Sequence, residues 1–89
     1  MISGKATVKN ASGMHIIPSQ QFAFIASGFE CLVTVKAKTR EADGKSILDM
    51  MTLNARLKEV LTITCDGPDE KECLAALTKY TETFRSNYK

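Results

Sequence analysis

The chain has 89 residues, of which 44% are hydrophobic and 25% are charged, and its 12 basic and 10 acidic side chains leave a formal net charge of +2. This composition is typical of an ordinary globular protein, excludes a disordered or fibrous chain, and favours a single domain over residues 1–89. The near balance of charge, with no run of Lys or Arg, argues against nucleic acid as a partner.

The first half of the chain predicts a strand, a helix and two further strands. Residues 2–9 alternate apolar and polar, as a half-buried strand does. Turn-forming residues at 10–13 then lead to Pro18, which suits the first turn of a helix near 16–27, with Gly28 as its stop. The β-branched run 31–38 predicts a second strand. A short strand near 40–43 returns as a hairpin.

The second half predicts a short helix, a strand and a long helix. Ser46 and Asp49 have the spacing of a capping box for a helix over about 47–53, and Asn54 is a plausible left-handed terminator. Residues 60–65 predict a strand that Asp66 and Gly67 close. An acidic start after Pro68 and a wide apolar stripe then predict a final helix.

These elements follow the order βαββαβα, so the fold class is α+β. Helices packed on one face of a mainly antiparallel four-stranded sheet would bury every apolar stripe. We therefore expect a two-layer domain with three helices on one side of the sheet.

Three cysteines, Cys31, Cys65 and Cys73, form no C-x-x-C pair and lie in apolar surroundings. They are interpreted as reduced packing residues. With one histidine and scattered carboxylates, the sequence predicts no metal and no cofactor. The N-terminus lacks a signal-peptide core and no apolar stretch approaches the roughly 20 residues that span a bilayer, so we expect a cytoplasmic protein without membrane insertion.

Three motifs occur together along the chain. They are Gly13-Met14-His15-x-x-Pro18, Gly44-Lys45-Ser46-Ile47-Leu48 followed by Met51 and Leu53, and Asp66-Gly67-Pro68-Asp69-Glu70. In type and spacing they resemble the HPr phosphocarrier family of the bacterial phosphoenolpyruvate:sugar phosphotransferase system, over essentially the whole chain. The fold that this resemblance implies is an open-faced sandwich.

The resemblance implies that His15 accepts a phosphoryl group from phosphorylated enzyme I and passes it to a sugar-specific carrier. Such a protein is a monomeric transfer protein rather than a stand-alone enzyme. A histidine just before a helix can place a phosphate against free backbone N–H groups, and those of Ile16 and Ile17 are the candidate donors. The residue pattern alone favours an ordinary surface residue at His15, and the resemblance to the family reverses that preference.

The chain departs from the family pattern two residues after the histidine. Relatives usually carry an arginine there, whose guanidinium suits phosphate oxygens, whereas this chain has Ile17. Arg56, in the loop after the second predicted helix, is the candidate substitute. The alternative is that Arg56 is a solvated loop residue.

Ser46 matches a serine that a dedicated kinase phosphorylates in some branches of the family, which would add that HPr kinase and a transcriptional regulator as partners. Ser46 can also serve only as a helix cap. A docking face for partners is expected where the first two helices adjoin, because apolar residues gather there and Phe24 lies half a turn from the buried stripe. Its members are Gln20, Phe24, Ile47, Leu48 and Met51. The alternative for Ile17 and Met51 is a place in the core.

Two functions from different classes are therefore weighed. The first is the phosphocarrier. The second is an HPr-like regulatory adaptor that has lost efficient phosphotransfer and acts through Ser46 and the apolar face, and Ile17 favours it. A nucleic-acid module is excluded because the predicted strands carry no aromatic residue.

Overall fold

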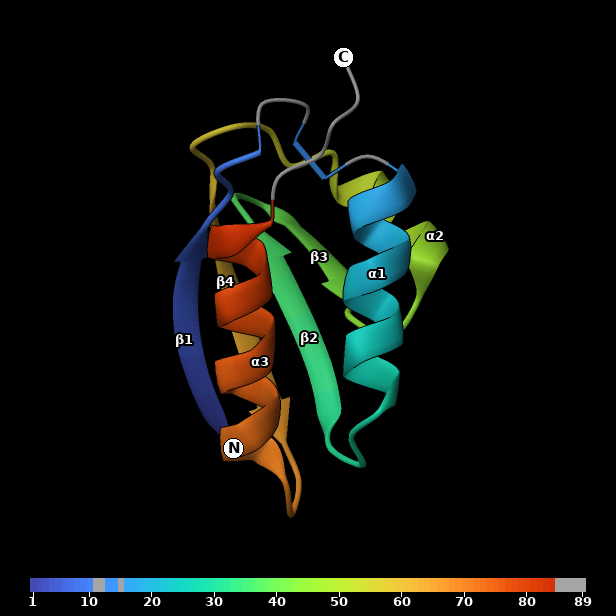
Figure 1. Cartoon of the computed structure of the whole chain (residues 1–89), viewed down its shortest axis with the longest axis vertical. Coiled ribbons are helices and arrows are strands. Elements are labelled where there is room, and N and C mark those ends of the chain that lie inside the picture. The colour runs from blue at the N-terminus through green and yellow to red at the C-terminus, as the bar shows by residue number, and fades with distance from the viewer. Residues whose placement is uncertain (11–12, 15, 85–89) are drawn as a thin grey trace.

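The computed structural model describes residues 1–10, 13–14 and 16–84 and contains the predicted elements in the predicted order (Figure 1). The strands and helices are β1 (Ile2–Thr7), α1 (Ile16–Ser27), β2 (Leu32–Ala37), β3 (Arg40–Asp43), α2 (Ile47–Leu53), β4 (Val60–Asp66) and α3 (Glu70–Thr83). Both α1 and α2 have the predicted bounds. No helix among the described residues is long and apolar enough to cross a membrane.

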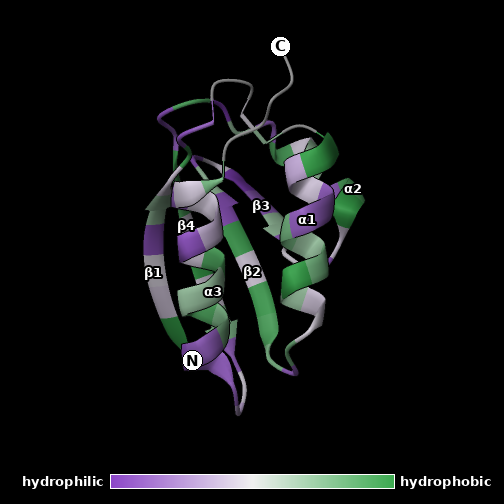
Figure 2. Cartoon of the chain, viewed as in Figure 1, coloured by the Kyte–Doolittle hydropathy of each residue, from purple (hydrophilic) through white to green (hydrophobic). Residues whose placement is uncertain are grey.

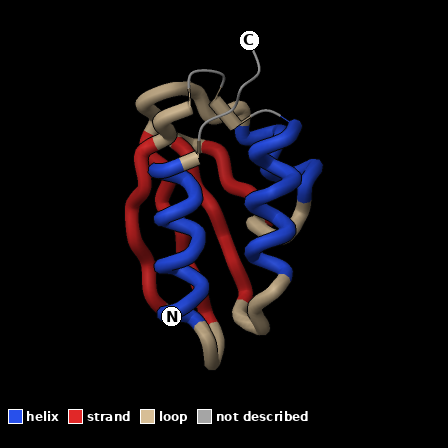
Figure 3. Tube along the Cα trace, in the orientation of Figure 1, coloured by secondary structure: helices blue, strands red, loops and turns tan. Residues whose placement is uncertain are grey.

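The four strands form one sheet in the order β1-β4-β2-β3, and every neighbouring pair is antiparallel. The helices pack on one side of this sheet, with α3 in front of β1 and β4 and with α1 between α3 and α2 (Figures 1 and 3). The α+β open-faced sandwich is therefore confirmed. The two inner strands, β4 and β2, are each paired on both edges.

The core lies between the sheet and the helices. Every second residue of β2 and β4 points into it, and the predicted inward face of Cys31, Val33, Val35 and Ala37 is confirmed because all four are buried. The helices contribute Phe22 and Ala26 from α1, Met50 and Leu53 from α2, and Cys73 and Leu77 from α3. Both layers thus share one continuous apolar interior.

The ends of α2 follow the local signals in the sequence, with one correction. The Ser46 hydroxyl oxygen accepts a hydrogen bond from the Asp49 N–H at 3.2 Å, and Asn54 ends the helix in the left-handed conformation at φ 51°. The reciprocal half of the predicted capping box is absent. The Asp49 carboxylate instead accepts a hydrogen bond from the Asp43 N–H at 3.1 Å, which ties α2 to the end of β3.

Candidate functional site

Two loops meet at the N-terminal end of α1. The Met14 N–H donates a hydrogen bond to the Ala55 carbonyl at 2.8 Å. Gly13 has φ +70°, and a Cβ atom placed on it would lie 2.5 Å from the Ala55 oxygen and 3.0 Å from the Arg56 Cα. These distances show that the loop that carries Arg56 packs directly against the segment before α1. Only glycine permits so close an approach without strain.

Further hydrogen bonds hold that segment on its other sides. The buried Asn10 side chain donates from Nδ2 to the Gly13 carbonyl at 3.2 Å, and the Gly13 N–H donates to the Asn10 carbonyl at 2.9 Å. The buried Ser19 hydroxyl donates to the Met14 carbonyl at 3.2 Å. Gly13 and Met14 are therefore anchored to the segment after β1, to α1 and to the loop after α2. His15, which follows them in the sequence, lies outside the described residues.

The start of α1 offers backbone donors but no charged side chain. The helix begins at Ile16, so the N–H groups of Ile16 and Ile17 lie in its first turn, where no carbonyl of a preceding turn can accept them. The partial positive charge at a helix N-terminus favours an anion here. The Ile16 side chain is exposed and that of Ile17 is half-buried, so the core alternative for Ile17 holds in part.

Arg56 is the cation nearest in sequence to this contact between the loops. Arg56 is exposed to solvent. Among residues 1–10, 13–14 and 16–84, no carboxylate forms an ion pair with the Arg56 guanidinium. The side chain is therefore not committed to a structural ion pair with any described residue.

The exposed residues predicted for docking on α1 and α2 are here called the apolar face, and Figure 2 colours the hydrophobic residues of both helices, buried and exposed, green. Phe24 is 81% exposed and Leu48 is 74% exposed, so both point to solvent as predicted. Ile47 is also exposed, and Met51 is 36% exposed and therefore does not belong to the core. Gln20 and Phe24 of α1 line a shallow groove together with Ile47 of α2. Three of the five predicted docking residues thus lie together, and the other two are exposed on α2.

Comparison with known proteins agrees with this geometry. The family model described as "PTS HPr component phosphorylation site" matches residues 2–83. The chain belongs to the HPr family. It is 34% identical over 77 residues to the phosphocarrier protein HPr of Cupriavidus necator, with 86% of each chain covered.

Solved HPr structures have the same fold. The phosphocarrier protein HPr of Bacillus anthracis superposes with a TM-score of 0.87 at 26% identity, over 91% of this chain and 96% of that one. The catabolite repression protein Crh of Bacillus subtilis superposes with a TM-score of 0.73 at 27% identity, over 91% of this chain and 93% of that one. HPr-family proteins thus include both named phosphocarriers and a protein named for catabolite repression.

Ser46 of this HPr-family chain lies in an acidic setting. Its hydroxyl caps α2, and the Asp43 carboxylate beside it accepts a hydrogen bond from the Lys45 N–H at 3.0 Å. The Asp49 carboxylate lies one turn further along. A phosphate at Ser46 would therefore meet the positive end of a short helix and two carboxylates that repel it.

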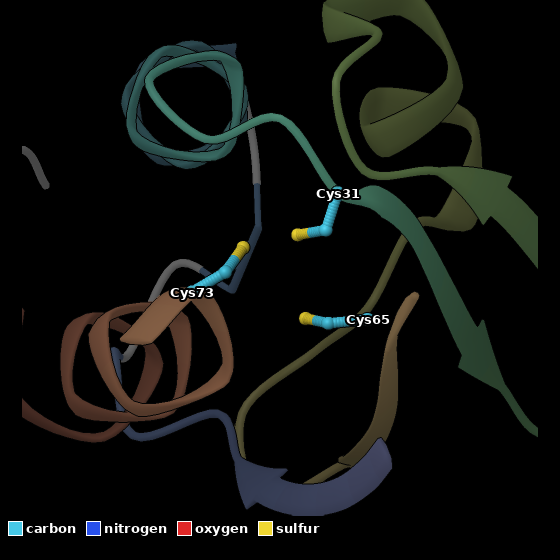
Figure 4. Close-up of side chains that lie close together, drawn as sticks. All are labelled: Cys31, Cys65 and Cys73. Atoms are coloured by element: carbon cyan, nitrogen blue, oxygen red, sulfur yellow. The ribbon is translucent and has the colours of Figure 1, made fainter. Parts of the chain in front are cut away.

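One group that the spacing analysis missed lies outside the HPr motifs. Cys31, Cys65 and Cys73 are buried free thiols, and their sulfur atoms all lie within 4.8 Å of one another (Figure 4). Burial raises the pKa of Cys31 and of Cys73 to about 11 and also raises that of Cys65, so the thiols are neutral at pH 7. No short sequence spacing signals this group, since its members come from three separate elements.

Proposed function

We propose that this HPr-family chain carries a phosphoryl group of the phosphotransferase system on His15, taking it from phosphorylated enzyme I and giving it to a sugar-specific carrier. The observation that carries the proposal is the start of α1 at Ile16, the residue that directly follows His15. A neutral imidazole is a nucleophile near its ordinary pKa of about 6.5. A phosphoryl group bonded to it could then accept hydrogen bonds from the N–H groups of Ile16 and Ile17.

Backbone N–H groups supply hydrogen bonds but not a full positive charge. Because Ile17 stands where relatives usually have an arginine, the proposal assigns that charge to Arg56. The contact of Gly13 and Met14 with Ala55 supports the assignment, since it holds the backbone of residue 56 beside the segment that leads to His15. The guanidinium can donate two hydrogen bonds to phosphate oxygens.

The apolar face is the proposed docking surface for both partners. Its large exposed side chains are suited to anchor a protein interface, because exposed aromatic and aliphatic groups lose water when a partner covers them. Its residue Gln20 lies about one helical turn after Ile16, the first residue of α1, which supports docking close to the residue that precedes this helix. We further propose a monomer in the cytoplasm, a reducing compartment in which the three cysteines form no disulfide.

The test is incubation of the purified chain with phosphoenolpyruvate and a bacterial enzyme I, followed by mass spectrometry for acid-labile phosphate. We expect one phosphate per chain, none in His15→Ala, and recovery of the label on a sugar-specific carrier. An HPr from another bacterium, labelled in parallel, is the positive control. If this control is labelled and the wild-type chain is not, the carrier function is refuted.

Arg56→Ala tests the source of the positive charge. Loss of a preorganised donor at a buried oxyanion slows a reaction by about 10² to 10³, and an exposed cation contributes less, so we expect a decrease of about 10- to 100-fold in the phosphotransfer rate. Lys9→Ala removes another exposed cation and serves as the matched control. Equal phosphotransfer rates for the two variants would show that Arg56 does not supply this charge.

The second candidate is a regulatory adaptor that acts through Ser46 and the apolar face. The similarity to Crh and the presence of Ile17 favour it. Incubation with ATP and an HPr kinase distinguishes the two functions. Acid-stable phosphate on Ser46 together with no label on His15 would favour the adaptor, and Ser46→Ala would abolish that phosphate.

A further inference from the structure

The three cysteine sulfurs converge from three elements onto one space in the core. Cys31 directly precedes β2, Cys65 belongs to β4 and Cys73 to α3, and in Figure 4 their side chains point toward one another. All three residues are at most 1% exposed. We propose that Cys31, Cys65 and Cys73 together bind one thiophilic d10 metal ion, such as Zn²⁺, Cd²⁺ or Cu⁺, through their three sulfur atoms.

The distances fit such an ion after small rotations of the side chains. Zinc–sulfur bonds measure about 2.3 Å, so three sulfurs around one ion stand roughly 3.8 to 4.0 Å apart. The three sulfurs here lie within 4.8 Å of one another. The largest movement required is thus about 1 Å, which a rotation about the Cα–Cβ bond provides.

The backbone at Cys31 is fixed by the loop between β4 and α3. The Asp69 carboxylate accepts hydrogen bonds from the Glu30 N–H at 2.8 Å and from the Cys31 N–H at 3.0 Å. A Cβ atom on Gly67 would lie 2.5 Å from the Cys31 Cα, so the loop packs as closely on Cys31 as a glycine allows. Asp69 therefore joins the start of β2 to the start of α3.

The other two ligands lie on regular elements that this loop connects. Cys65 lies in the central strand, opposite Val33 of β2. The Cys73 N–H donates to the Asp69 carbonyl at 3.0 Å in the first turn of α3. Ligands held on strands and helices keep their positions, which lowers the cost of ordering them around an ion.

The donor set selects a soft cation. Thiolate sulfur favours Cu⁺ and Zn²⁺, whereas Mg²⁺ and Ca²⁺ require oxygen ligands. Among the described residues the group consists of these three cysteines, so it supplies three ligands. The ion displaces the thiol protons to solvent. The positive charge of the bound ion stabilises the resulting thiolates.

The test uses the reduced full-length chain, titrated without oxygen with Zn²⁺, Cd²⁺ or Cu⁺ against a chelator of known affinity. Native mass spectrometry gives the stoichiometry, and the ultraviolet sulfur-to-metal charge-transfer band of Cd²⁺ or Cu⁺ reports sulfur ligation. We expect one ion per chain, a charge-transfer band and a higher thermal midpoint, and the relative affinities identify the preferred ion. If none of the three ions binds at one per chain, the proposal is wrong.

Alanine variants at each cysteine show whether three sulfurs act together. Loss of a group that merely orients a ligand lowers metal affinity by about 10- to 100-fold, so loss of a ligand itself should lower it by more than about 100-fold at each position. Met50→Leu, which changes a buried sulfur outside the group, is the matched control and should bind as the wild type does. A cysteine whose replacement leaves the affinity unchanged would overturn the three-sulfur site.

Circular dichroism of each metal-free variant checks that it folds. If an alanine variant does not fold, valine at the same position refills the volume and takes its place. A disulfide is the competing use of these thiols. To test for it, the chain is isolated from cells under anaerobic conditions, and its free thiols and bound metal are counted. Loss of two free thiols with no metal bound would show a disulfide and contradict the proposal.

Discussion

Gly13→Ala tests the contact that positions the segment before α1. Gly13 has φ +70°, where a residue with a Cβ atom costs about 1 to 2 kcal/mol more than glycine. The new Cβ would lie 2.5 Å from the Ala55 carbonyl oxygen, a backbone atom that cannot rotate away. The Met14 to Ala55 hydrogen bond must then lengthen, which removes about 0.5 to 1.5 kcal/mol more. We expect a total loss of about 1.5 to 3.5 kcal/mol in the free energy of unfolding.

Urea unfolding followed by circular dichroism measures this loss. With an m-value of about 2 kcal/mol per molar, the midpoint should fall by about 0.8 to 1.8 M. The phosphotransfer rate should fall as well, because the loop of Arg56 moves away from the start of α1. Gly28→Ala is the matched control, since its Cβ would meet one atom, the Ile25 oxygen, at 3.3 Å and its φ is not positive. Equal midpoints for the two variants would refute the reasoning.

Three further predictions concern the docking face, the end of α2 and the acidic loop. Phe24→Ala should weaken binding to enzyme I by about 2 kcal/mol, measured by calorimetry, and should leave the free energy of unfolding nearly unchanged. The control is Leu32→Ala, which removes an exposed side chain from β2 and should leave binding to enzyme I unaltered. Asn54→Ala should lower the free energy of unfolding by about 1 kcal/mol and Asn54→Gly should not, because the position is left-handed; equal losses would contradict this. The pKa of Asp69 lies below its ordinary 3.8 because the carboxylate accepts hydrogen bonds from the Glu30 N–H and, secondarily, from the Cys31 N–H. Asp69→Asn should therefore reduce the urea midpoint at pH 7. The contribution of the carboxylate is lost as pH falls through the pKa of the folded state, so the midpoints should converge in acid, and a pH-independent difference would contradict the assignment.

Local signals in the sequence predicted the helices and the exposure of Phe24. The bounds of α2 follow from Ser46 and Asn54, which act on their own backbone neighbours and need no tertiary information. Phe24 was predicted to face solvent because the period of a helix separates it from Phe22, and the structure confirms this.

The features that sequence reasoning missed depend on contacts between distant segments. Cys31 and Cys65 were each expected to face inward, but their proximity follows from the pairing of β2 with β4, which no local pattern encodes. Asp69 was expected to favour the start of α3, and its side chain instead contacts the backbone before β2. The role of His15 stays a prediction, since that residue lies outside the described residues.

The strand order has a consequence for synthesis on the ribosome. β4 lies between β1 and β2 and supplies hydrogen bonds to both, yet it is the last strand to be translated. Since chains emerge from the N-terminus onward, β1 and the β2–β3 hairpin must wait with unpaired edges until residues 60–66 appear. The sheet therefore closes in one late step.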